Sequence, residues 1–193
     1  MKLINCKSAL KTLRSGLPII FPTDTLPAIG CLPNFSNIIY AFKKRDKNKP
    51  LILMGSEHKD LIDYVHESAR EDFEIIASKY WPGALTIVIP ASAQQNELLT
   101  SKDHTLGLRI PNSSIAQSLI QETGPLLTSS ANISGFTGPI TAEGITFDFP
   151  SVEILGPIPW EKSSGKASTI ISWKKIGDWR LIREGEVFVK ELN

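Results

Sequence analysis

Cysteine and histidine are scarce in this chain. It contains two cysteines, Cys6 and Cys31, with no C-x-x-C pair, and its three histidines lie far from both in the sequence. A zinc site or a disulfide framework needs several such residues at short, regular spacings. The sequence therefore argues against both, and it fits a reducing cytoplasm.

Long apolar runs and a strong charge imbalance are missing as well. No segment approaches the roughly 18 uninterrupted apolar residues that a membrane-spanning helix needs. Residues 1–16 carry charges throughout and have no apolar core of signal-peptide length. We therefore expect a cytoplasmic protein without a membrane segment. The formal net charge of +1 argues against a protein that coats DNA.

The common nucleotide and nucleophile motifs are also absent. Neither GxxxxGK(S/T) nor GxGxxG occurs, which excludes ordinary P-loop and Rossmann nucleotide binding. No G-x-S-x-G elbow is present.

The chain does have enough apolar sequence for one domain, residues 1–193, with 41% hydrophobic residues. Helices are predicted at 8–14, 35–42, 61–65, 73–80 and 115–120 from apolar residues at helical spacing. Strands are predicted at 17–21, 51–54, 85–89, 106–110, 126–127, 168–173 and 180–183. This alternation favours a layered α/β domain with a mostly central sheet.

Four polar stretches follow strands, where α/β folds tend to place ligands. In the first, FPTDTLPAIG (21–30), Thr23, Asp24 and Thr25 sit in a loop that two prolines restrict. These side chains either face a ligand or form a turn that satisfies its own backbone.

The second stretch, KKRDKNKPLIL (43–53), crowds five basic residues around the end of a predicted helix: Lys43, Lys44, Arg45, Lys47 and Lys49. Cations there complement the helix dipole and can form a solvated face. Like charges also repel one another, and a triphosphate would relieve that repulsion. Arginine offers such a ligand a planar fork, and lysine offers a point charge.

The third stretch, TLGLRIP (105–111), places Arg109 on the same strand face as Gly107 and Thr105. Arg109 either grips a carboxylate in a cavity or forms an internal salt bridge. The fourth, LLTSSANISGFTGP (126–139), runs from a strand into a predicted loop at 129–141 that is rich in small hydroxyl and amide groups. Such a loop either offers backbone N–H and hydroxyl groups as hydrogen-bond donors to an anion, or it is an ordinary surface turn.

Taken in order, these stretches resemble the YrdC family. FPTDTLPAIG is similar to its Pro-Thr-(Asp/Glu)-Thr-Val-Tyr-Gly-Leu-Gly signature, and KKRDKNKPLIL to its Lys-x-Arg-Pro-x-x-x-Pro-Leu segment. YWPGALTIVI resembles Trp-Pro-Gly-Pro-(Leu/Val)-Thr, TLGLRIP resembles Val-Ala-Val-Arg-x-Pro, and LLTSSANISG resembles Thr-Ser-Ala-Asn-x-Ser-Gly. AST and LIREG resemble the closing Ser-Thr and Leu-Arg-x-Gly elements. The blocks cover nearly the whole chain.

The resemblance implies a YrdC-like twisted mixed β-sheet flanked by helices, with a basic concave face that binds nucleotide. It implies a nucleotidyltransferase that converts L-threonine, bicarbonate and ATP into threonylcarbamoyl-AMP and pyrophosphate. The product would pass to a partner transferase complex that modifies adenosine in tRNA, with weak binding of tRNA or double-stranded RNA. Mg²⁺ would arrive on the triphosphate rather than in a protein metal site.

The resemblance also implies residue roles by position. Lys43 and Arg45 would be catalytic. ATP would be held by Lys43, Arg45, Lys49, Thr105, Ser130, Asn132 and Arg183. Threonine would be held by Thr25, Arg109, Thr128 and Ser168.

This chain departs from the family pattern at several positions. The usual Tyr and Gly of the first signature are Pro27 and Ala28, the Pro after Lys-x-Arg is Asp46, and Met54 stands where some members have His. Gly138 replaces a serine beyond the Asn-x-Ser-Gly loop. Most of these changes fall near the amino-acid side of the expected pocket.

Three other interpretations stay open. One is a divergent YciO-like member that binds nucleotide or RNA without this activity. That branch loses the Lys-x-Arg and Ser-Ala-Asn elements, whereas this chain keeps both. The second is a non-catalytic RNA-binding module, which would need aromatic residues stacked beside its basic surface. The third is an enzyme that keeps ATP-dependent adenylation but acts on another amino acid.

Overall fold

A ten-stranded mixed sheet organises the computed structural model, which describes residues 1–93, 103–133, 135 and 138–190. The strand order is β1-β8-β2-β3-β7-β4-β6-β5-β9-β10. The strands are β1 Leu3–Ile4, β2 Ile19–Phe21, β3 Ala28–Cys31, β4 Ile52–Met54, β5 Leu85–Pro90, β6 Thr105–Arg109, β7 Leu126–Ser130, β8 Glu153–Leu155, β9 Thr169–Lys175 and β10 Asp178–Arg183. None of the described helices is long and apolar enough to cross a bilayer.

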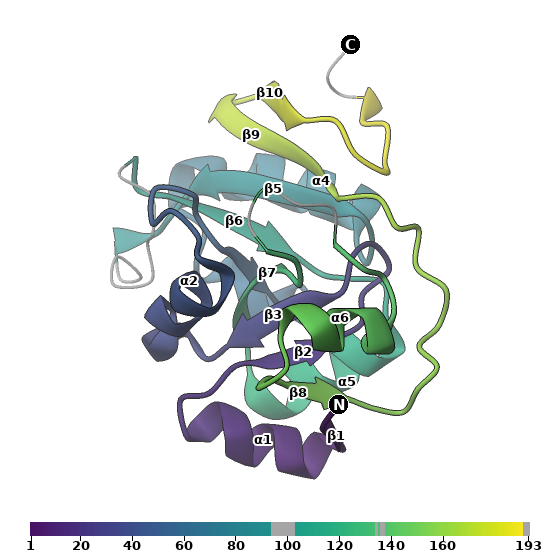
Figure 1. Ribbon diagram of the computed structural model, residues 1–193. Helices are drawn as coiled ribbons and strands as arrows, with labels where there is room; N and C mark the ends of the chain where they lie inside the picture. Colours follow the sequence, from purple (N-terminus) through teal and green to yellow (C-terminus); the bar gives the residue numbers. More distant parts are fainter. Residues whose placement is uncertain (94–102, 134, 136–137, 191–193) are drawn as a thin grey trace.

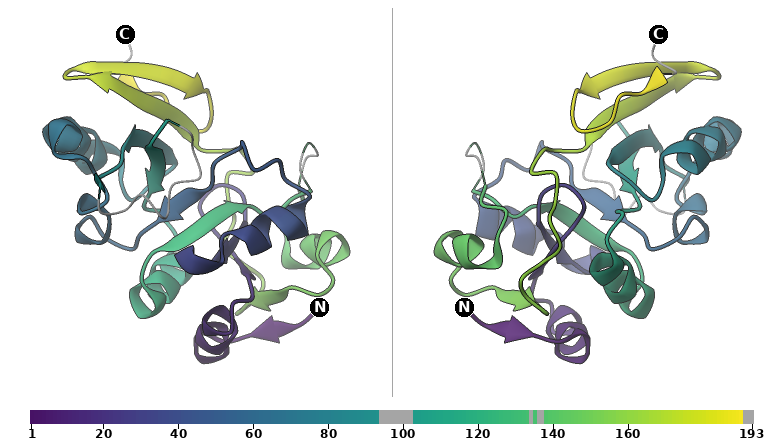
Figure 2. Two further views of the ribbon diagram at one scale, coloured as in Figure 1. Left: turned by 90° about the vertical axis from the view of Figure 1, so that its left-hand side faces the viewer. Right: turned by 90° about the vertical axis from the view of Figure 1, so that its right-hand side faces the viewer.

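Six α-helices are interspersed with the described strands, and Figure 1 shows how they surround the sheet. They are α1 Cys6–Arg14, α2 Asn37–Lys43, α3 Lys59–Ile62, α4 Arg70–Tyr80, α5 Ser114–Thr123 and α6 Ala142–Asp148, with 3₁₀ turns at Pro33–Phe35 and Glu67–Ala69. The β9–β10 hairpin lies at one end of the molecule, and α1 with β1 lies at the other (Figure 2).

Local sequence explains where several helices begin and end. α1 starts at Asn5, whose side chain accepts a hydrogen bond from the backbone of Ser8, and α5 starts in the same way at Ser113. α5 stops at Gly124, which has a φ of 77°.

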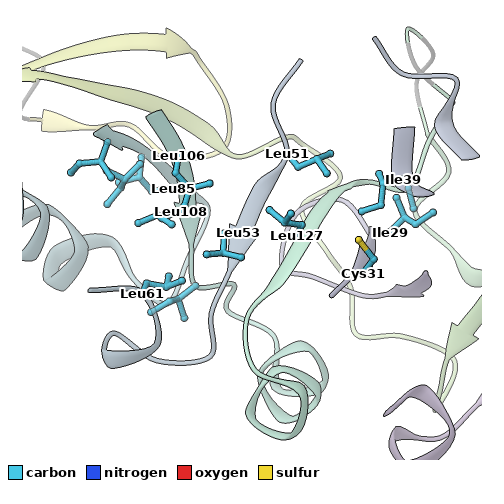
Figure 3. Close-up of a cluster of buried hydrophobic side chains, with 14 of the residues drawn as sticks. Ile29, Cys31, Ile39, Leu51, Leu53, Leu61, Leu85, Leu106, Leu108 and Leu127 are labelled. Carbon is cyan, nitrogen blue, oxygen red and sulfur yellow. The ribbon is translucent and has the colours of Figure 1, made fainter. Parts of the chain in front are cut away.

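The larger apolar core gathers leucines from the central strands and from the helices over them. Leu53, Leu85, Leu108 and Leu127 come from β4, β5, β6 and β7 and are fully buried, with Leu61 of α3 beside them (Figure 3). A second core packs α1 and α5 against the other side of β2 and β7. Burying both sides makes the central sheet a rigid platform.

Most predicted elements are confirmed, but four were missed. β1, β3, α6 and β8 lie in segments without a predicted element. β3 is wholly buried, although it follows Pro27 closely and reads as part of a loop. A proline just before a strand removes no ladder hydrogen bond, so it does not prevent the strand.

Strand register brings distant residues into rows across the sheet. β4 and β6 run parallel, pairing Ile52 with Gly107 and Met54 with Arg109. β7 runs antiparallel to β4 and pairs Thr128 with Ile52. Ser130 therefore lies toward the start of β4 and β6, while Arg109 lies at their far end.

Candidate functional site

A cavity of about 720 Å³ opens over the central strands. It is lined by side chains from β4, β5, β6, β7 and β10, and by the loops that precede β3, β4 and β9. Ten of the eleven predicted site residues line it, with Lys43 as the exception. The described lining includes four basic side chains and no acidic one, so the cavity suits an anion: Arg45, Lys49, Arg109 and Arg183.

One end of the cavity, which we call the Lys43 end, gathers residues near the start of β4 and β6. Its members are Lys43, Arg45, Lys49, Thr105, Ser130 and Asn132. Arg45 donates from Nε to the Lys49 carbonyl at 3.1 Å and from Nη2 to the Pro50 carbonyl at 3.0 Å. These bonds position its guanidinium but leave its positive charge without a carboxylate partner among the described residues.

Asp46 does not supply that counter-charge by a direct bond. Its Oδ1 accepts from the backbone N–H of Asn48 at 2.9 Å and from the Asn48 side chain at 3.0 Å. The Asp46 carboxylate therefore stabilises the turn at residues 46–48 and forms no direct bond with the nearby cations. It still raises the pKa of Arg45, although burial has the larger effect and lowers it.

Lys43 was predicted to hold ATP, but its side chain is buried beneath the loop after β7. Its side chain is 1% exposed, and Nζ donates to the carbonyl oxygens of Ser130 and Asn132, the second at 2.7 Å. Burial and the nearby Arg45 lower the pKa of Lys43 to about 7. Lys43 therefore does not line the cavity itself, but it holds Ser130 and Asn132, which do.

The helical pattern explains this placement of Lys43. Ile39 and Tyr40 are buried on the inner face of α2, and Lys43 follows them at i+4 and i+3, so it shares that face. The same spacing in the sequence was a signal that this lysine is buried.

The loop after β7 is compact around Asn132. Ser130 Oγ donates to Asn132 Oδ1 at 2.5 Å, and Lys43 Nζ lies 3.3 Å from the same oxygen. A Cβ on Gly138 would lie 2.5 Å from the Cβ of Asn132, so glycine is needed for this close approach. Ser134, part of the Asn-x-Ser-Gly motif, lies outside the described residues.

The opposite end, which we call the Arg109 end, comprises Asp24, Thr25, Arg109, Ser168 and Arg183. Arg109 is 3% exposed and makes an ion pair with Asp24 at 2.7 Å. It also donates to Thr25 Oγ1 at 2.8 Å and to the Gly83 carbonyl at 3.0 Å. The internal salt bridge is therefore present, and Arg109 also lines the cavity, where its contact with a ligand carboxylate stays a prediction.

Of the two alternatives for the loop at 21–30, a ligand contact or a turn that satisfies its own backbone, Thr23 follows the second. Its hydroxyl accepts from the backbone N–H of Thr25 at 3.2 Å and donates to the Leu26 carbonyl at 2.7 Å. This turn aims Asp24 and Thr25 at Arg109. Asp24 also accepts from the backbone N–H of Asn112 at 3.1 Å, which ties the loop to the end of β6.

Arg183 lies beside Ser168, at the Arg109 end, although its predicted ligand is ATP. Its Nη2 donates to the Ser168 carbonyl at 2.8 Å and to Ser168 Oγ at 3.2 Å. Ser168 Oγ also lies 2.9 Å from Thr86 Oγ1. Burial and the charge of Arg45 lower the pKa of Arg183, so the two ends of the cavity interact electrostatically.

Several lining residues were not predicted as site residues. Thr86 and Val88 alternate along β5 and therefore share the face that looks into the cavity, as do Ile52 and Met54 on β4. Strand alternation was the signal for them. Thr128, which was predicted, uses its hydroxyl to donate to the Ile52 carbonyl at 2.9 Å.

A second cavity of about 680 Å³ lies between β10 and residues 184–189. None of the predicted site residues lines it. The predicted site residues therefore point to the central cavity as the functional one.

Comparison with known proteins agrees with this fold and these motifs. A threonylcarbamoyl-AMP synthase from Yersinia pestis (strain Pestoides F) is 33% identical over 153 residues, which cover 76% of this chain and 80% of the relative. Sua5 from P. abyssi in complex with L-threonine has a TM-score of 0.83 and 28% identity, and the match covers 96% of this chain. It covers only 58% of the Sua5 chain, so this protein spans less than two thirds of that relative.

YciO from E. coli shares the fold over almost its full length. Its TM-score is 0.82 at 23% identity, and the match covers 100% of this chain and 98% of YciO. The Sua5_yciO_yrdC family, described as "Telomere recombination", matches residues 11–185. On these matches, the chain belongs to the Sua5/YciO/YrdC family.

Proposed function

We propose that this protein is an enzyme that makes threonylcarbamoyl-AMP and pyrophosphate from L-threonine, bicarbonate and ATP, for threonylcarbamoyladenosine in tRNA. The observation that carries the proposal is the central cavity, whose described lining has four cations and no carboxylate. The synthase relatives and the threonine complex of Sua5 support the choice of substrates.

The triphosphate would occupy the Lys43 end. Arg45 offers a guanidinium that is held in place only by backbone carbonyls, and Lys49 adds a second charge from the same loop. Thr105, Ser130 and Asn132 offer hydroxyl and amide groups beside them. Lys43 would contribute by fixing Ser130 and Asn132, so that these groups are in position before ATP binds.

Threonine would occupy the Arg109 end. The bonds of Arg109 to Asp24, Thr25 and Gly83 use three of its five N–H groups, and two remain for a carboxylate. Thr25, Thr128 and Ser168 line the cavity nearby. Arg183, held on Ser168, would face the point where the two substrates meet.

The chemistry then needs alignment more than proton transfer. The threonine amine attacks the carbon of bicarbonate, a C–O bond breaks and water leaves, which gives a carbamate. A carbamate oxygen then attacks the α-phosphorus of ATP while pyrophosphate leaves. The carbamate is already an anion, so no strong general base is required. Proximity of well-oriented groups is worth about 7–11 kcal/mol in the best cases, and fixed cations stabilise the developing charge.

Mg²⁺ would enter with the triphosphate. Phosphate oxygens and water would hold most of its coordination sites, as is usual for Mg²⁺ that arrives on a nucleotide. The product would pass to a tRNA-modifying transferase complex in the cytoplasm, with weak RNA binding by the basic cavity rim. We further propose that residues 1–193 form one domain, in agreement with the single continuous sheet.

The test is an assay of the purified protein with ATP, Mg²⁺, bicarbonate and L-threonine, with each substrate omitted in turn. We expect pyrophosphate and the adenylate to form only when threonine and bicarbonate are both present. ATP binding without threonine-dependent turnover would overturn the proposal and favour a divergent, YciO-like member. Salt-sensitive binding of tRNA without any effect of ATP would favour an RNA-binding module.

A further inference from the structure

Gly107 is unlike the other glycines of this chain. All thirteen glycines lie in the described residues; five have positive φ angles, and in seven others an added Cβ would lie 2.8 Å or less from another atom. Gly107 has neither constraint, because its Cβ would meet its nearest neighbour, Thr86 Cγ2, at an ordinary 3.6 Å. Neither backbone conformation nor packing explains a glycine at this position.

A glycine inside a strand lowers the stability of the strand, so its presence there needs another explanation. It destabilises a strand by about 0.5–1 kcal/mol relative to alanine, and it often marks a place where a ligand approaches the backbone. Gly107 lies in the middle of β6 and lines the central cavity. The missing side chain therefore leaves a notch in the cavity floor.

The walls of this notch are set by strand register. Ile52 of β4 and Val88 of β5 pair with Gly107 from either side, and both line the cavity. The atoms that would surround an added Cβ most closely are Thr86 Cγ2 at 3.6 Å, Ile52 Cγ1 at 3.7 Å and the Leu51 carbonyl oxygen at 3.9 Å. The two closest walls of the notch are therefore apolar, its one polar atom is an acceptor, and it has room for one methyl group at ordinary contact distances.

These walls favour one part of the substrates over the others. A phosphate would lose its hydration in an apolar notch without gaining a hydrogen bond, and an adenine ring is too broad for a space of one methyl. The closest wall, Thr86, is bonded to Ser168 at the Arg109 end. Arg109 itself follows Gly107 by two residues on the same strand face. An aliphatic amino-acid side chain fits this position.

We propose that Gly107 sets the depth of the amino-acid pocket, and that its notch admits a β-substituent one carbon longer than the methyl group of threonine. This inference rests on the proposed function. It makes Gly107 a specificity-determining residue, because a methyl group added to the protein would fill the space that an extra carbon on the substrate would occupy.

The probe is L-3-hydroxynorvaline, which is threonine with an ethyl group in place of its β-methyl. We expect the wild-type protein to use both amino acids with kcat/KM values within about threefold. In Gly107→Ala, the preference for threonine over hydroxynorvaline should rise at least tenfold, since one methyl in an apolar pocket typically changes selectivity by about 10–200-fold. An unchanged ratio, including an equal loss for both substrates, would overturn the inference.

Gly156→Ala is the matched control. Gly156 directly follows β8 and does not line the cavity, and a Cβ there would lie 2.6 Å from Leu3 Cδ2. We expect it to lower the melting temperature without changing the ratio, whereas Gly107→Ala should not lower it. A ratio that shifts in Gly156→Ala as well would contradict the assignment. Threonine turnover by the wild type separately decides the proposed function, and its absence would overturn both.

Discussion

The two arginines that mark the ends of the cavity are held in opposite ways. At the Arg109 end, the paired end, the buried guanidinium of Arg109 is neutralised by Asp24, and its geometry is fixed by three acceptors from two separate segments. At the Lys43 end, the unpaired end, Arg45 is held by carbonyl oxygens alone, and the carboxylate of Asp46 bonds within its own loop. A paired arginine suits a zwitterionic ligand, whereas an arginine without a carboxylate partner calls for a polyanion.

The largest expected effect is at the paired end. Arg109→Ala would leave the Asp24 carboxylate, whose side chain is 16% exposed, without its partner. Breaking such a buried pair costs about 3–5 kcal/mol, and we expect a loss of that order in the free energy of unfolding, measured with urea. In a double-mutant cycle, Asp24→Ala combined with Arg109→Ala should cost clearly less than the sum of the two. Strict additivity would show that the pair is not coupled.

The second expected effect is at the unpaired end and should appear in activity rather than in stability. Arg45→Ala removes a side chain that bonds only to carbonyls of its own exposed loop, so we expect less than about 1 kcal/mol of destabilisation. Loss of a cation aimed at the triphosphate should lower ATP turnover at least about 100-fold. An active Arg45→Ala protein would contradict the assignment of Arg45 to ATP binding. Arg45→Lys keeps the positive charge without the planar guanidinium, so comparing the two variants would separate the effect of charge from that of guanidinium geometry.

The third effect is a pH dependence from the Lys43 end. The pKa of Lys43 is lowered from 10.5 to about 7 in the folded protein, so the unfolded chain binds the extra proton between these values. Stability should therefore rise with pH through that window, by up to about 1.4 kcal/mol per pH unit. Urea titrations at pH 7, 8 and 9 would measure the slope. We expect Lys43→Met to flatten it, and equal slopes in both proteins would assign the effect to other groups.

Sequence periodicity was a good guide to the elements that carry these two ends. Helix 35–42 is observed as α2, preceded by a 3₁₀ turn at Pro33–Phe35, and the strand at 106–110 is β6. β3 was missed because Pro27 and Pro33 enclose it so closely that its four buried residues look like a loop. Short strands carry too few residues for their pattern to outweigh such neighbours.

The sequence predicted which residues form the candidate site better than it predicted the contacts between them. The motif residues converge on one cavity, but the sequence could not reveal that Asp24 pairs with Arg109, because 85 positions separate them. It also could not place Arg183 on Ser168, since that contact depends on the register of the β9–β10 hairpin, in which Arg183 pairs with Ile170. Lys43 was different, because its helical spacing from Ile39 already indicated burial.

The strand order has a consequence for biosynthesis. Residues from β10 and from the loop before β9 complete a cavity whose other walls come from β4, β5, β6 and β7. β9 joins the sheet beside β5, and β10 joins only through β9. A nascent chain emerging from the ribosome therefore has no complete site until these late segments are synthesised and docked, so half-made chains would not compete with finished ones for substrate.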